Sequence, residues 1–213
     1  QRHCIAVNSG TSGLHLALNA LGIKQGDEVI VPSFTFAATA NAVALTGATP
    51  VFVDIDPQTF NIDPAAIEAA ISPRTRAIQP VHLYGQPAAM KEIMAIAARY
   101  DLIVAEDSAQ AHMASLDGTP VGAFGATGVF SFYPTKNMTS GEGGMISAAS
   151  DVVARQCRLL RNQGMEKRYV NEIIGFNTRM TEIHAAIGRV QLTKLARWTE
   201  QRRANAKFLD ENL

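Results

Sequence analysis

The chain contains little that would predict disulfides or a metal site. Only two of its 213 residues are cysteines, Cys4 and Cys157, and they lie far apart in the sequence. Two free thiols in a reducing cytoplasm are the simplest interpretation, so we expect a cytoplasmic protein. The five histidines show no HxxxH spacing, so we expect no metal site.

Charge of one sign and long apolar runs are also missing. Nineteen basic and nineteen acidic residues give a formal net charge of zero, which argues against a basic face for nucleic acid or an anionic membrane. The apolar runs are short and interrupted, so we expect no transmembrane helix. The phosphate-binding patterns GxGxxG and GxxxxGK[ST] are absent too. With 47% hydrophobic residues, the chain can still bury one large core.

Predicted strands and helices alternate along the chain. Strands are expected at 3–7, 28–31, 50–54, 76–80, 102–105 and 144–148, and helices at 12–21, 36–45, 65–71, 88–100 and 151–161, before a polar helical stretch over 179–213. The third helix has a clear start, because Asp63 can cap it and Pro64 suits its first turn. This alternation predicts an α/β domain with a mostly parallel sheet covered on both faces. We find no repeat or linker and expect one domain over residues 1–213.

Lys136 lies in a loop just after an apolar strand, with the hydroxyl of Ser131 five positions before it. A lysine in such a place can form a Schiff base with a carbonyl group when its amine is deprotonated. The pattern is weak by itself, because most lysines at the end of a strand are simply solvated.

Three other segments strengthen this interpretation. Asp107 follows the strand expected at 102–105, at the strand end where open α/β sheets bind ligands. The Gly/Ser/Thr turn at 8–13 opens a helix, whose free N–H groups can hold a phosphate. The segment 32–39 offers an aromatic ring from Phe34 or Phe36. A phosphate cradle, a flat ring, a carboxylate and a lysine are together what pyridoxal phosphate (PLP) needs.

Taken together, these segments resemble the DegT/DnrJ/StrS sugar aminotransferases. The matching stretches follow one another at residues 9–12, 27–36, 81–87, 106–112, 130–144, 175–180, 185–188 and 191–192. The resemblance implies the aspartate-aminotransferase fold, with this chain as its large PLP-binding domain in a three-layer α/β/α arrangement. Because the chain starts at Gln1 without an initiator methionine, we expect a fragment that lacks a short N-terminal segment. The smaller C-terminal domain of the relatives would begin near or after Leu213.

The resemblance also assigns the residues that face the cofactor ring. Lys136 would hold the cofactor covalently and then move the proton to and from the substrate carbon. Asp107 would pair with the pyridine nitrogen and keep it protonated. Phe36 would stack on one face of the ring, and we then expect Phe34 in the core. Gln110 would lie beside the ring near Asp107.

The cofactor phosphate would be held from two sides. Thr11 and Ser12 would bind it through N–H and hydroxyl groups, with help from the hydroxyl of Ser131. In relatives, the residue that corresponds to Asn177 crosses a dimer interface and touches the partner's phosphate. A simple turn next to Gly175 is the alternative for Asn177.

The histidines carry weaker signals. His15 falls on the apolar face of the first helix, and we expect a packed structural residue. His82 and His112 lie near the expected cofactor edge, without an assigned role.

The function implied by the resemblance is transamination of a keto group on a nucleotide-linked sugar, with an amino acid, expected to be glutamate, as donor. The partner would be a second copy, in a homodimer with composite active sites. Relatives that are dehydratases carry a histidine in place of Lys136, which this chain does not. Two alternatives stay open: an aminohydroxybenzoate-type synthase, which keeps the lysine, and a regulatory protein of the same fold, which need not keep it.

Overall fold

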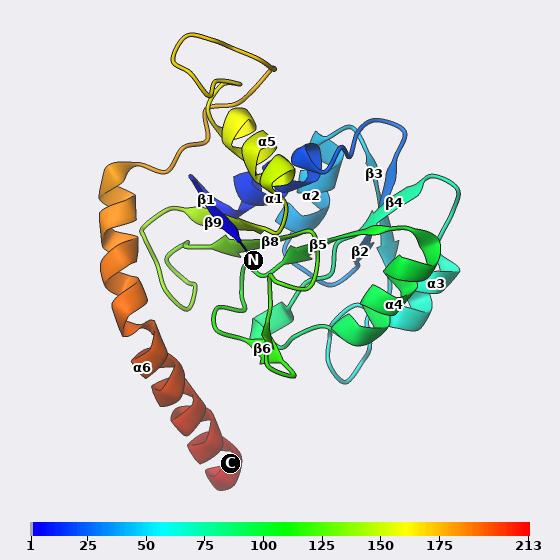
Figure 1. The fold of residues 1–213 in the computed structure, drawn as a ribbon. Coiled ribbons are helices and arrows are strands. Elements are labelled where there is room, and N and C mark those ends of the chain that lie inside the picture. The colour runs from blue at the N-terminus through cyan, green and yellow to red at the C-terminus, as the bar shows by residue number, and fades with distance from the viewer. Residues whose placement is uncertain (1) are drawn as a thin grey trace.

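A seven-stranded sheet organises the chain (Figure 1). In the computed structural model, which describes residues 2–213, its strand order is β1-β9-β8-β5-β4-β2-β3. The strands are β1 (His3–Val7), β2 (Glu28–Pro32), β3 (Thr49–Val53), β4 (Thr75–Ile78), β5 (Ile103–Asp107), β8 (Thr127–Ser131) and β9 (Gly144–Ala148), with a separate short ribbon of β6 (Ser115–Leu116) and β7 (Thr119–Pro120). Only β9 runs antiparallel to its neighbours, β1 and β8, in this sheet. The predicted mostly parallel sheet is therefore confirmed.

Helices cover both faces of the sheet (Figure 1). The helices are α1 (Gly10–Ala20), α2 (Ala38–Leu45), α3 (Pro64–Ala69), α4 (Met90–Tyr100), α5 (Asp151–Arg161) and α6 (Glu182–Asn212), with a short 3₁₀ turn at Leu83–Gly85. Buried side chains of α1, α2 and α5 form one core with the sheet, and those of α3 and α4 form a second core on the opposite face. The result is the predicted three-layer α/β/α arrangement.

Helix caps explain where several helices begin. Ser9 caps α1 by accepting a hydrogen bond from the N–H of Ser12, so α1 starts two residues before its predicted start. Asp63 caps α3 as predicted, and Pro64 occupies the first turn. The second helix starts at Ala38 instead of Phe36. The ring of Phe36 is therefore part of the connection between β2 and α2.

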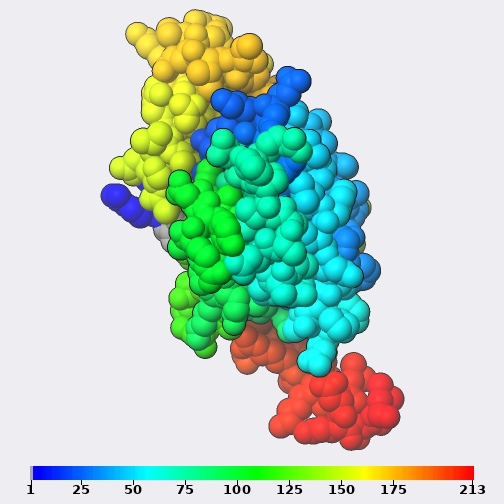
Figure 2. Space-filling view, turned by 90° about the vertical axis from the view of Figure 1, so that its right-hand side faces the viewer, coloured from blue at the N-terminus to red at the C-terminus, as the bar shows by residue number. Residues whose placement is uncertain are grey.

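The last helix differs from the others. α6 is 31 residues long, and Leu195 is its only buried residue. It runs past one end of the sheet, and its C-terminal half projects beyond the rest of the molecule (Figure 2). None of the helices in residues 2–213 is both long enough and apolar enough to cross a membrane.

Candidate active site

A pocket of about 410 Å³ lies where the carboxyl ends of β5 and β8 meet the N-terminus of α1. Strand ends and a helix start converge there because the parallel strands point to the same edge of the sheet. Six of the eight residues predicted for the site line this pocket: Thr11, Phe36, Asp107, Gln110, Ser131 and Lys136. Ser12 and Asn177 do not. The pocket therefore collects residues from five separate parts of the sequence.

Asp107 is the buried acid of the pocket, with 5% of its surface exposed. Its Oδ2 accepts a hydrogen bond from the Thr39 hydroxyl at 2.8 Å, and its Oδ1 accepts one from the N–H of Ala109 at 3.1 Å. Burial raises the pKa of the Asp107 carboxyl, while these two hydrogen bonds and the positive charge of Lys136 oppose that rise. Among residues 2–213, no basic group lies within ion-pair distance of it. The carboxylate is thus suited to a cationic or protonated ligand atom.

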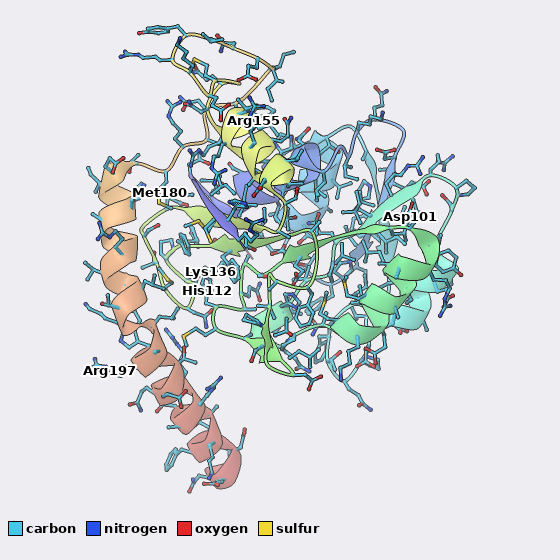
Figure 3. The ribbon with its side chains drawn as sticks, in the orientation of Figure 1. Asp101, His112, Lys136, Arg155, Met180 and Arg197 are labelled. Carbon is cyan, nitrogen blue, oxygen red and sulfur yellow. The ribbon has the colours of Figure 1, made fainter. Side chains whose placement is uncertain are left out.

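Lys136 lies on a loop that the rest of the fold holds in place. The loop leaves β8 and returns to β9, and its two arms are joined by a hydrogen bond from the N–H of Phe132 to the carbonyl of Gly143. α6 supports the loop, because Arg202 Nη2 donates to the carbonyl of Asn137 at 3.1 Å. Lys136 and His112 lie close together on the side of the sheet that faces α6 (Figure 3).

The N-terminus of α1 forms one wall of the pocket, through Ser9, Gly10 and Thr11. The first N–H groups of a helix have no partner within it, and here they lie beside Ser131. A Cβ added at Gly10 would come 2.8 Å from the Cβ of Ser131, so only glycine allows this close approach. Ser12 takes part in the helix cap, since Ser9 Oγ accepts from its N–H and also contacts its Oγ at 3.0 Å, and its assignment to the phosphate stays a prediction.

The two candidate rings have separate surroundings. Phe36 lines the pocket and is 70% exposed. Phe34 lies 6.0 Å from the ring of Phe60, centroid to centroid, and is 46% exposed. The expectation that Phe34 belongs to the core is therefore wrong. The reason is that β2 ends at Pro32 and α2 begins at Ala38, so both rings lie on an exposed connection.

Gln110 and Asn177 complete the predicted set. Gln110 Oε1 accepts a hydrogen bond from the N–H of Tyr84 at 2.8 Å, which fixes the orientation of its amide. Asn177 is exposed, pairs through a β-bridge with Asn162, and does not line the pocket of its own chain. Its assignment to a partner's phosphate stays a prediction.

The histidines and cysteines lie outside the pocket. His15 is half-buried against Phe176, with ring centroids 5.0 Å apart, and burial lowers its pKa. Burial also lowers the pKa of His112, which packs against Phe130 and Phe132. Cys4 and Cys157 are free thiols, as expected. Burial raises the pKa of Cys157 to about 12, so this thiol is inert. Within residues 2–213, no cluster of His, Cys, Asp and Glu could hold a metal ion.

The sequence did not predict three further residues that line the pocket or hold its side chains in place. Thr39 donates to Asp107 from the first turn of α2, and the pair is 68 residues apart in sequence. Tyr133 and Glu142 also line the pocket. A threonine at the start of a helix usually caps it, so nothing in the sequence marks Thr39 as a partner of Asp107.

Comparisons with known proteins match the whole chain. The sequence profile of the DegT/DnrJ/EryC1/StrS aminotransferase family matches residues 1–213. GDP-perosamine synthase of Caulobacter vibrioides is 54% identical over 196 residues, which cover 91% of this chain and 53% of that protein. A protein of Geobacillus stearothermophilus named as a pleiotropic regulatory protein is 50% identical over 206 residues, which cover 96% of this chain and 55% of that protein. The crystal structure of DesV from S. venezuelae matches with a TM-score of 0.93 and 46% identity, over 96% of this chain and 55% of that one. The chain thus spans about half the length of the curated relatives it matches.

Proposed function

Because this chain belongs to the DegT/DnrJ/EryC1/StrS aminotransferase family, we propose that the protein transfers an amino group to a keto group of a nucleotide-linked sugar. In this proposal PLP is the cofactor and an amino acid, glutamate, is the donor. The observation that carries the proposal is that one pocket holds Lys136, Asp107 and the N-terminus of α1. The relative named GDP-perosamine synthase supports a sugar substrate in a nucleotide-linked form.

The pocket fits PLP in size and in the placement of its groups. Its volume of about 410 Å³ is within the usual range of small-molecule sites. Among residues 2–213 the buried Asp107 carboxylate forms no ion pair, so it suits a protonated pyridine nitrogen. The start of α1 and the hydroxyl of Ser131 suit a phosphate. When bound, PLP supplies a ring that withdraws electrons and so stabilises negative charge on the substrate carbon.

The protein's own groups would divide the work as follows. Lys136 holds the cofactor through its amine and later moves the proton at the reacting carbon, because one amine can serve as nucleophile and then as base. Asp107 holds a proton on the ring nitrogen, and the pairing offsets the cost of burying its charge. Phe36 packs on the ring face. Gln110 presents its Nε2 donor, since its Oε1 is taken by Tyr84.

The assembly proposed is a homodimer with composite sites. The support comes from Asn177, which is exposed and does not line the pocket of its own chain. A residue so placed can complete a neighbour's site across an interface. Two free thiols and the enzymatic proposal together support a cytoplasmic location.

A half-reaction tests the proposed function. Full-length protein loaded with PLP and given glutamate, without any sugar, should release one 2-oxoglutarate per site, and a matching keto-sugar nucleotide should then accept the amino group. Lys136→Ala is the control and should release none. The compounds tested should include an aminodehydroquinate-type substrate. Turnover of that compound and of no keto-sugar nucleotide would identify a synthase instead. If no amino donor reacts with PLP-loaded wild-type protein, the aminotransferase proposal is wrong and a regulatory role, as in the name of the Geobacillus relative, takes its place.

A further inference from the structure

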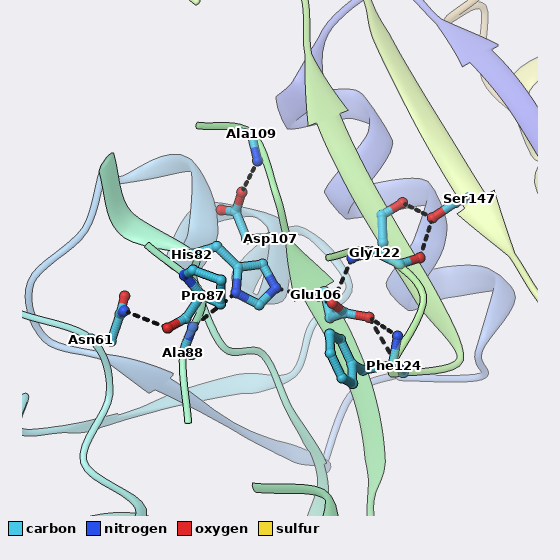
Figure 4. Close-up of polar contacts among 12 residues, drawn as sticks. Asn61, His82, Pro87, Ala88, Glu106, Asp107, Ala109, Gly122, Phe124 and Ser147 are labelled. Atoms are coloured by element: carbon cyan, nitrogen blue, oxygen red, sulfur yellow. Dashed lines mark hydrogen bonds and ion pairs between the residues drawn. The ribbon is translucent and has the colours of Figure 1, made fainter. Parts of the chain in front are cut away.

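Glu106 and His82 form a fully buried pair next to the proposed active site, and neither lines its pocket (Figure 4). Glu106 directly precedes Asp107 in β5, so the alternation along the strand places the two carboxylates on opposite faces of the sheet. Four N–H donors surround the Glu106 carboxylate: Gly122 N at 2.6 Å and His82 Nε2 at 3.0 Å on Oε2, and Phe124 N at 2.8 Å and Gly125 N at 2.7 Å on Oε1. Four donors match the acceptor sites of an ionised carboxylate.

The hydrogen bonds of His82 fix its tautomer. Its Nδ1 accepts from the N–H of Ala88 at 3.1 Å, so the ring proton is on Nε2, which donates to Glu106. Both ring nitrogens are therefore used within the protein. Because no ring nitrogen is left for a ligand, the role open to His82 is to position other residues.

The segment that carries His82 contacts two residues of the pocket. The N–H of His82 donates to the carbonyl of Asp107 at 3.0 Å, and the N–H of Asp107 donates to the carbonyl of Pro80 at 2.9 Å. Two residues further on, the N–H of Tyr84 donates to Gln110 Oε1. The position of His82 thus affects both the backbone of Asp107 and the amide of Gln110.

Glu106 also connects β5 to the loop before β8. This loop lies very close to β8, because a Cβ added at Gly128 would come 2.2 Å from the Cα of Gly122. Ser147 of β9 holds the same loop by donating to the carbonyl of Gly122 at 2.7 Å. A shift of Glu106 would therefore change how the strand end with Asp107 lies against the strand end with Ser131.

We propose that Glu106 and His82 are positioning residues for the cofactor site: together they hold Asp107 and Gln110 where these two groups meet the ring, without touching it themselves. This inference rests on the proposed function, because it needs PLP in the pocket.

Two substitutions of His82 in the full-length protein test the inference through PLP binding. His82→Leu removes both side-chain hydrogen bonds, and His82→Gln keeps an N–H donor toward Glu106. We expect the Kd for PLP, measured by equilibrium dialysis, to rise about 10-fold in His82→Leu, a typical effect of losing an outer partner of a site. The rise should be smaller in His82→Gln.

The pH dependence of the bound cofactor gives a second measurement. The midpoint of its absorbance change should move in His82→Leu, because the charge on the ring depends on Asp107. Among the described residues, the charges of His82 and Lys136 act on Asp107, and the titratable side chains of Tyr133 and Glu142 line the same pocket. Ile93→Ala is the matched control, since Ile93 is fully buried in the core that includes Val104 of β5. This control should lose stability while keeping the Kd and the midpoint.

The results separate the inference from the proposed function. A Kd and a midpoint in His82→Leu that match those of Ile93→Ala would overturn the positioning role while leaving the aminotransferase proposal intact. If His82→Leu does not fold, His82→Gln decides, and a Kd equal to that of wild-type protein overturns the role. Wild-type protein that does not bind PLP at all would defeat the proposed function, and this inference with it.

Discussion

At the scale of single residues, burial determines how Asp107 behaves. Burial raises the pKa of its carboxyl above the value in the unfolded chain, in spite of hydrogen bonds from Thr39 and Ala109. A carboxyl whose pKa is raised by folding makes its full contribution to the stability of the fold only when the pH is below its pKa in the unfolded chain, about 3.9. That contribution is lost as the pH rises through the folded pKa, since the unfolded state then releases its proton more easily. Without a cofactor, the burial of Asp107 therefore makes the fold less stable at neutral pH than at low pH.

Asp107→Asn should make the cofactor-free protein more stable than wild type at pH 7, with a smaller difference near pH 3. The new side-chain amide can be accommodated, because the Thr39 hydroxyl can accept a hydrogen bond from the amide and donate instead to Thr35 Oγ1, 3.1 Å away. Urea unfolding at the two pH values measures this. The same variant should transfer amino groups roughly 10²- to 10³-fold more slowly, as expected when a preorganised charge is removed. Wild-type protein that is the more stable of the two at pH 7 would refute the burial argument.

Phe36→Ala should weaken PLP binding roughly 2- to 12-fold, the equivalent of the 0.5–1.5 kcal/mol that an aromatic stacking contact contributes. Stability should hardly change, because Phe36 is 70% exposed. The matched control is Phe34→Ala, which removes a ring from the same connection but not from the pocket. Fluorescence titration with PLP compares the two. A larger loss of PLP affinity in Phe34→Ala than in Phe36→Ala would assign the stacking role to Phe34 instead.

At the scale of helices and strands, the sequence predicted the bounds of those elements that are set by neighbouring residues in the chain. The bounds of β1, β9 and α5 were predicted as observed, and the Asp63–Pro64 pair correctly placed the start of α3. The direction of β9 was not predicted. The loop from β8 to β9 contains no helix, and a parallel neighbour would have needed a crossover. Lys136 and Asp107 could be found because Asp107 ends an apolar strand and Lys136 follows another. The partners Thr39 and His82 come from remote parts of the chain, which only the fold brings together.

Gly10→Ala tests the contact between α1 and β8. The new methyl group would lie 2.8 Å from the Cβ of Ser131, so the helix start must move away from it. We expect PLP affinity to fall about 10-fold or more, and inorganic phosphate to protect the protein less against thermal unfolding. Gly188→Ala in α6 is the control, because its methyl would have ordinary room at 3.4 Å and alanine favours a helix. Equal PLP affinities in the two variants would show that α1 does not hold the phosphate.

At the scale of the whole molecule, α6 is the most exposed helix of the described residues, with one buried residue in 31. Exposed apolar side chains follow it from one end to the other: Ile183, Ile187, Val190, Leu192, Phe208 and Leu209. Asn177 does not line the pocket of its own chain, and we propose that it reaches the pocket of a second copy.

Mixed dimers test this composite site. Lys136→Ala and Asn177→Ala homodimers should each have little activity. Mixing them by refolding should restore up to about a quarter of wild-type activity, since half of the dimers are mixed and each has one intact site. Co-refolded homodimers of one variant are the control. No recovery in proven heterodimers, or a fully active monomer in sedimentation, would contradict the composite site.

The central claim is that Lys136 holds PLP, and borohydride tests it most directly. Reduction of the PLP-loaded, full-length protein, followed by proteolysis and mass spectrometry, should place the pyridoxyl label on the peptide that contains Lys136. Lys136→Ala should take up no label under the same conditions. A label on any other lysine, or wild-type protein that binds PLP without becoming labelled, would contradict the account.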